Sequence, residues 1–195
     1  MTSGNRTLPS VTQILALTDL GPDFSRIPDS VMEKARRRGD AVHAAIELHG
    51  YGICDDVAPE IAPYLSAYEK FLVDTRHVPV VSEKEVISAR WRYVGHVDRV
   101  GFQDEGRWLL DWKSSETLAL QPVALQLAGY KIAWNELHPK APVTVTAAVQ
   151  LKRDGTYRLH VIDTKPVEHI FQAAVVVVHA RGGFHGDDDR DRRAD

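Results

Sequence analysis

The chain has 195 residues, 44% of them hydrophobic, and a formal net charge of −3 at pH 7, which fits one domain with an ordinary core. This charge balance excludes a globally basic surface, so a nucleic-acid partner would need positive charge gathered locally. The single cysteine, Cys54, excludes an internal disulfide and a cysteine-only metal cluster. No apolar run reaches the length of a membrane span and no secretory pattern opens the chain, so we expect a cytoplasmic protein without a membrane partner.

The first part of the sequence is predicted to be helical. A short apolar helix is expected over 11–20. The run Ser30-Val31-Met32-Glu33 has the form of a capping box, with Asp29 as an alternative cap, and predicts the start of a longer helix. Gly50 ends that helix, and apolar residues at helical spacing predict another over 60–75.

The rest of the chain is predicted to contain both strands and helices. Three strands are expected first, over 78–88, 91–102 and 106–114, followed by a helix over 122–138. Two more strands are expected over 143–151 and 157–162, and a last helix over 166–180. Val175–Val178 weakens the last helix, for which a strand is the alternative. This order predicts an α/β fold with a central mixed sheet and helices on its faces. The helix between the third and fourth strands implies a right-handed crossover to a parallel neighbour.

The most informative stretch is the predicted hairpin, because each of its strands carries an acid. Asp111 and Lys113 project from the same face, since side chains alternate along a strand. If the turn is Asp104-Glu105, Asp98 faces Asp111 directly. A shift of two residues puts Asp98 opposite Lys113, and a shift of one puts it on the wrong face.

Opposed carboxylates in this register have Cβ atoms about 5 Å apart and repel each other unless a cation bridges them. Hard divalent ions such as Mg²⁺ prefer carboxylate oxygens and water. Lys113 would then orient or deprotonate a metal-bound water, whose pKa the metal lowers. The alternative is that Asp111 and Lys113 form a surface ion pair of little energetic value.

Five motifs in this order resemble the PD-(D/E)xK nuclease superfamily: Arg38-Gly39-x-x-x-His43, Glu83-x-Glu85, Gly95-x-x-Asp98-Arg99-Val100, Asp111-Trp112-Lys113-Ser114-Ser115 and Gln126-Leu127-x-x-Tyr130. The match covers about residues 30–135 and is most similar to the RecB-like exonuclease branch, including phage and mitochondrial single-strand exonucleases. It implies a restriction-endonuclease-like fold, a central mixed β-sheet flanked by helices, over residues 29–180. Residues 1–28 would precede this domain as a segment with one short helix, and 181–195 would follow as a disordered charged tail.

The resemblance also implies a metal site. Asp98, Asp111 and the backbone carbonyl of Trp112 would bind the catalytic ion, Mg²⁺ or Mn²⁺, with His43 beside it. Lys113 would assist the attacking water.

The first predicted strand would add another acid to this site. Glu83 and Glu85 are expected on one face, and we choose Glu85 because it lies nearer the strand centre, with Glu83 as the alternative.

Substrate contacts are expected from the helix and loops around this site. The resemblance assigns Gln126 and Tyr130 to the substrate. Ser114, which follows the lysine, is a further candidate. The run Arg36–Arg38 lies close to His43 in sequence and is a candidate phosphate grip, with Arg38 as the expected site residue.

These expectations describe a metal-dependent DNA nuclease, most simply an exonuclease acting on single- or double-stranded ends in DNA repair, recombination or phage DNA processing. The alternatives are a structure- or site-specific endonuclease on the same fold and a non-catalytic DNA-binding module. The single cysteine excludes the iron–sulfur cluster of some branch members. Helicase motifs are missing, so we expect a stand-alone nuclease domain or a subunit with recombination or helicase proteins as partners.

Overall fold

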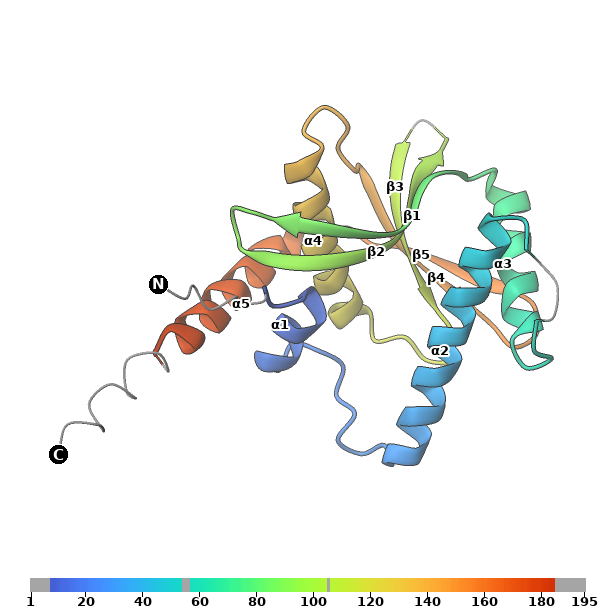
Figure 1. The fold of residues 1–195 in the computed structure, drawn as a ribbon, viewed down its shortest axis with the longest axis horizontal. Coiled ribbons are helices and arrows are strands. Elements are labelled where there is room, and N and C mark those ends of the chain that lie inside the picture. Colours follow the sequence, from blue (N-terminus) through green and yellow to red (C-terminus); the bar gives the residue numbers. More distant parts are fainter. Residues whose placement is uncertain (1–7, 54–56, 105, 185–195) are drawn as a thin grey trace, which may run out of the picture.

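Five strands form one sheet in the order β1-β2-β3-β4-β5 (Figure 1). The computed structural model describes residues 8–53, 57–104 and 106–184. Only β3 and β4 run parallel, and the other neighbours are antiparallel. The mixed α/β sheet predicted from the sequence is therefore confirmed, with strands β1 (Val78–Ser88), β2 (Tyr93–Gln103), β3 (Gly106–Lys113), β4 (Val145–Leu151) and β5 (Tyr157–Val161).

Helices cover both faces of this sheet, and each face has its own hydrophobic core. On one face α1, α4 and α5 pack around residues such as Leu109, Tyr130 and Phe171. On the other face α2 and α3 pack around Phe71 and Trp112. The helices are α1 (Val11–Leu17), α2 (Asp29–Gly50), α3 (Ala62–Thr75), α4 (Leu120–Leu137) and α5 (Lys165–Phe184).

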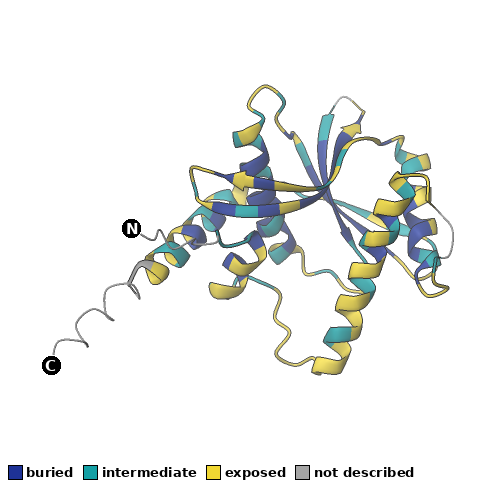
Figure 2. Cartoon of the chain, in the orientation of Figure 1, coloured by how far each residue is buried: buried dark blue, intermediate teal, exposed yellow. Residues whose placement is uncertain are grey.

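The central strand β3 is buried on both faces, because Leu109 belongs to one core and its neighbour Leu110 to the other. A charged side chain at the end of this strand therefore lies in a partly enclosed space. By contrast, α2 is exposed along most of its length (Figure 2), and only Val42 and Ile46 on it are buried. His43 follows Val42 at the point where α2 meets the sheet.

The predicted hairpin register is confirmed. Arg99 pairs with Leu110, and Gln103 pairs with Gly106, which leaves two residues for the turn. This is the register in which Asp98 faces Asp111.

Several local predictions are corrected. The capping box expected at Ser30 is wrong: Pro28 is the N-cap of α2, and Ser30 lies inside the helix. A capping box does form at α1, where the Ser10 side chain accepts the Gln13 backbone N–H and the Gln13 side chain accepts that of Ser10.

The C-terminal element is a helix and not the alternative strand. It continues through Phe184, four residues past the predicted boundary at 180. The remainder of the predicted tail and Cys54 lie outside the described residues. Among the described helices, none combines the length and apolar character needed to cross a membrane.

Candidate active site

Two buried carboxylates meet where β2 and β3 run together. The pair Arg99 and Leu110 is the last in the ladder, so Asp98 and Asp111 lie one step beyond it. They are 8% and 2% exposed. Burial raises the pKa of Asp98, and the charge of Asp111 raises it further, because two close carboxylates resist ionising together. A bound cation would relieve this repulsion.

The backbone of Trp112 joins this acid pair to α2. Its N–H donates a hydrogen bond to Asp98 Oδ2 at 2.7 Å, and its carbonyl oxygen lies 3.3 Å from His43 Nε2. The indole ring packs edge-on against Tyr68 and Phe71 in the core of the opposite face. Trp112 therefore offers its backbone to the site, while its ring anchors the strand.

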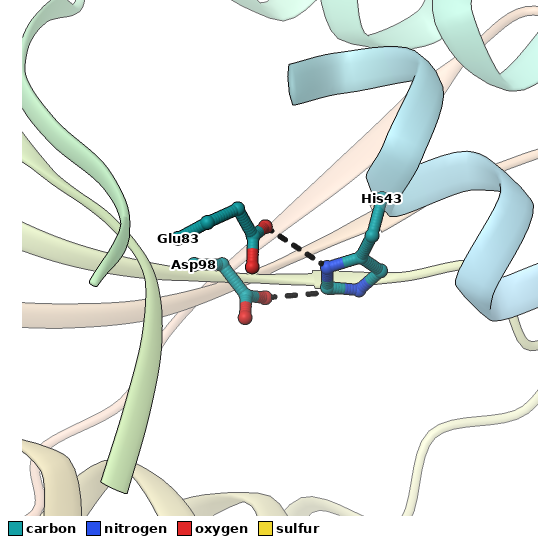
Figure 3. A group of neighbouring side chains, drawn as sticks. All are labelled: His43, Glu83 and Asp98. Carbon is teal, nitrogen blue, oxygen red and sulfur yellow. Dashed lines mark hydrogen bonds and ion pairs between the residues drawn. The ribbon is translucent and has the colours of Figure 1, made fainter. Parts of the chain in front are cut away.

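His43 reaches from α2 into a cluster with Glu83 and Asp98 (Figure 3). Its Nδ1 lies 3.3 Å from Glu83 Oε1, and its Nε2 lies 3.8 Å from Asp98 Oδ2. Burial lowers the pKa of His43, but the hydrogen bond to Glu83 and the surrounding carboxylates outweigh it and raise the pKa to about 9. One ligand atom from each of the three residues lies within 4.8 Å of the others, which is compact enough for one ion.

Glu83, and not Glu85, is the acid that β1 brings to this cluster. Glu85 is exposed and pairs in register with His96, so its placement in the site is corrected. Glu83 has a φ of 44°, in the left-handed region that non-glycine residues rarely adopt. The regular alternation of side chains is broken there, since Val86, and not Glu85, is buried next along the strand.

Lys113 is held between a carboxylate and an amide. Its Nζ lies 2.6 Å from Asp111 Oδ2 and donates to Gln126 Oε1 at 3.1 Å. Burial lowers the pKa of Lys113, but the charges of Asp111 and Asp98 outweigh that effect and raise it. The ammonium group is therefore kept charged and pointed along the acid pair.

Gln126 and Tyr130 lie one turn apart on α4 and extend this chain of contacts. Gln126 Nε2 donates to the Tyr130 hydroxyl at 2.9 Å. Burial, with the nearby Asp111 charge, raises the pKa of Tyr130, so the phenol stays neutral. A Cβ at Gly95 would lie 2.8 Å from Tyr130 Cδ1, so the glycine in β2 is what lets the tyrosine ring lie close against the sheet.

The donor set fits a hard divalent ion. Asp111 Oδ2 is buried and is paired with the Lys113 ammonium group, whose Nζ lies 2.6 Å away. The carboxylate oxygens and the backbone carbonyl are oxygen donors of the kind that suit Mg²⁺ or Mn²⁺.

The three arginines of the run Arg36–Arg38 differ in their partners. Arg36 and Arg37 both pair with Glu33, at 3.0 and 2.8 Å. Arg38 makes no ion pair within the described ranges, and its Nε is buried without a hydrogen-bond partner. Ser114 follows Lys113 at the end of β3 and is half-buried.

Arg99 is a buried residue beside the site that the sequence interpretation did not select. It is 2% exposed, donates to the Tyr68 hydroxyl at 2.9 Å, and lies over the Trp112 ring at 5.8 Å. Its position directly after Asp98 on a strand is the sequence signal that it points to the opposite core.

This chain resembles known proteins in its fold and not in its sequence. Neither a family model nor a curated protein matches the sequence. Among solved structures, an alkaline exonuclease from Laribacter hongkongensis is similar, with a TM-score of 0.52 and 9% identity over 96% of this chain and 95% of that one. The same exonuclease in complex with dAMP gives a TM-score of 0.50 and 11% identity over the same shares. The fold is therefore restriction-endonuclease-like, a mixed five-stranded sheet flanked by helices.

Proposed function

We propose that this protein is a divalent-metal-dependent nuclease that hydrolyses phosphodiester bonds in DNA, and that it acts as an exonuclease. The observation that carries the proposal is the meeting of Asp98, Asp111 and Lys113 around the Trp112 backbone. The structural likeness to an alkaline exonuclease supports it at the level of the fold. We also propose that the protein belongs to the RecB-like branch and that it acts in DNA repair, recombination or phage DNA processing.

The metal would be held by Asp98, Asp111 and the Trp112 carbonyl, with His43 and Glu83 completing the site. When bound, Mg²⁺ or Mn²⁺ lowers the pKa of a water and offsets negative charge that develops on the phosphate. An imidazole that ligates a metal is neutral, so His43, whose pKa the neighbouring carboxylates raise to about 9, would have to lose its proton to serve as a ligand. Glu83, which lies at Nδ1, would accept the N–H that remains and fix the tautomer.

Lys113 acts as a charged donor in this mechanism. Its raised pKa makes it a poor base at neutral pH, so its role is to orient the attacking water and contact a phosphate oxygen. Gln126 holds the ammonium on one side and is itself held by Tyr130. These hydrogen bonds fix the orientation of the lysine side chain. A catalytic group that is held in the correct orientation lowers the entropic part of the activation barrier.

End-labelled linear DNA tests the proposal, with Mg²⁺ or Mn²⁺ and with wild type, Asp111→Ala and Lys113→Ala side by side. Wild type should release labelled nucleotides, and both variants should be inactive. Covalently closed circular DNA in the same tubes should stay intact, because an exonuclease needs an end. Cutting of the circle would favour the endonuclease alternative, and equal digestion by all three proteins would reject the assignment.

A further inference from the structure

A pocket opens beside the candidate active site, at the carboxyl ends of the two parallel strands. The β3–β4 ladder ends at Lys113 and Gln150. The residues just beyond it, Ser114 and Ser115 after β3 and Lys152 and Arg153 after β4, line a cavity of about 340 Å³. Ligands of open α/β sheets bind outside the carboxyl ends of parallel strands, so this is where a substrate extending from Lys113 would pass.

The serine side of the pocket is held firmly in place. Gln150 Nε2 donates to the carbonyl oxygens of Ser115 and Glu116, at 2.8 and 2.9 Å. His160 Nε2 lies 3.2 Å from Gln150 Oε1 and steadies that amide. Neither serine hydroxyl makes a hydrogen bond to another described residue, so both are available to a ligand from a backbone that is already ordered.

The other side carries positive charge. Lys152 and Arg153 are exposed and form no ion pair in the part of the chain that the structure describes. The acid in the same turn, Asp154, accepts the Thr156 N–H and hydroxyl at 2.9 and 2.6 Å, so its carboxylate is turned back on its own turn. A second acid, Glu116, is exposed at the rim.

We infer that this pocket binds a non-scissile phosphate of the DNA strand, next to the one that is cut. The inference rests on the proposed function and deepens it by naming a second contact with the same substrate. Hydroxyls and cations are the groups that proteins commonly place on phosphate oxygens. Ser115 follows Lys113 by two residues, about 7 Å along an extended chain, which brings the pocket within reach of a neighbouring nucleotide.

Binding of a fluorescein-labelled single-stranded oligonucleotide tests this inference without any hydrolysis, because EDTA prevents cutting. The test variant is Lys152→Ala/Arg153→Ala. The matched control is Lys140→Ala/Lys165→Ala, which removes the same charge from two exposed residues, one in the loop before β4 and one at the first position of α5, at the opposite end of the parallel pair.

The test variant should bind about tenfold more weakly than the control at low salt. Its plot of log affinity against log salt should be shallower by about 0.7 for each phosphate that the protein no longer neutralises. With Mn²⁺ in place of EDTA, KM for the same oligonucleotide should rise while kcat stays unchanged.

A salt dependence identical to that of the control would overturn the pocket while leaving the nuclease proposal intact. Conversely, wild type that binds the oligonucleotide with the expected salt dependence but never cuts it would reject the nuclease proposal and keep the pocket as a DNA contact.

Discussion

The Asp98 carboxylate accepts the backbone N–H of Trp112 at 2.7 Å, and through this bond an acid of β2 is tied to the residue whose carbonyl oxygen faces His43. The bond keeps a buried carboxylate beside a second one. This hydrogen bond requires an acceptor oxygen at position 98 but not a negative charge. The structural role of Asp98 can therefore be tested separately from the role of its charge.

Asp98→Asn should therefore keep the fold and lose the activity. The amide oxygen still accepts the Trp112 N–H, while removal of the charge ends the repulsion with Asp111 that helps raise the pKa of Asp98. A raised acid pKa destabilises the folded state at neutral pH, so the unfolding free energy in EDTA should increase by about 1 to 2 kcal/mol. Urea denaturation measures that gain, and calorimetry with Mn²⁺ should show affinity weakened at least about a hundredfold. A variant that is less stable yet binds Mn²⁺ normally would contradict both parts.

Glu83→Gln and Glu85→Gln form a matched pair that removes the same charge two residues apart. Glu83 touches His43, whereas Glu85 is exposed. We expect Glu83→Gln to lower kcat/KM on linear DNA by about 10- to 100-fold, as is usual for groups that orient a metal ligand. Glu85→Gln should stay within about twofold of wild type. The opposite ranking would restore Glu85 as the site acid.

Gly95→Ala tests how Tyr130 is seated. The added Cβ would lie 2.8 Å from Tyr130 Cδ1 and 3.2 Å from Val86 Cγ2, and overpacking of this kind costs about 1 to 3 kcal/mol. Displacing the ring also pulls its hydroxyl away from Gln126, so activity should fall together with stability. Gly50→Ala is the control, since a Cβ at Gly50 meets nothing within 4 Å. Equal unfolding free energies for the two variants would show that the β2 backbone at Gly95 has room for a side chain.

The pH dependence of stability should carry the signature of His77. Burial, with the nearby Arg99 charge, lowers the pKa of His77 to about 4. Between about pH 4 and 6.5 the unfolded chain therefore binds more protons than the folded protein does. The free energy of unfolding is unaffected by the protonation of His77 above pH 6.5, and it decreases as the pH falls from 6.5 to about 4. Relative to wild type, His77→Gln should gain about 1 to 2 kcal/mol on going from pH 7 to pH 5. Urea denaturation at both pH values checks this, and a pH-independent difference between the two proteins would argue against a neutral, buried His77.

Sequence reasoning located the acid pair because a two-residue turn and the period of two along a strand fix which residues face each other. Asp98 and Asp111 followed from Gln103 and Gly106 being paired. The same period failed on β1, where the positive φ of Glu83 breaks the alternation that made Glu83 and Glu85 equivalent. A backbone deviation of this kind is invisible in residue types, because glutamate has no preference for it.

The helix start at Pro28 was missed for a related reason. Ser30 and Glu33 match a capping box locally, but Glu33 instead pairs with Arg36 and Arg37 inside the helix. The buried Arg99 was overlooked because its hydrogen-bond partner, Tyr68, lies on α3, 31 residues earlier in the chain. Contacts of this type depend on the packing of α3 against the sheet and leave no local pattern.

The central claim is that a divalent ion held by the β2–β3 acid pair is needed for hydrolysis. The most direct measurement is the Mg²⁺- or Mn²⁺-dependent release of nucleotides from end-labelled linear DNA by Asp111→Asn and Asp104→Asn. Both substitutions remove one carboxylate from the same hairpin, and asparagine readily adopts the φ of 50° at position 104. We predict that Asp104→Asn matches wild type and that Asp111→Asn releases no nucleotide at any metal concentration. Metal-dependent release by Asp111→Asn at the wild-type rate would contradict the proposed active site.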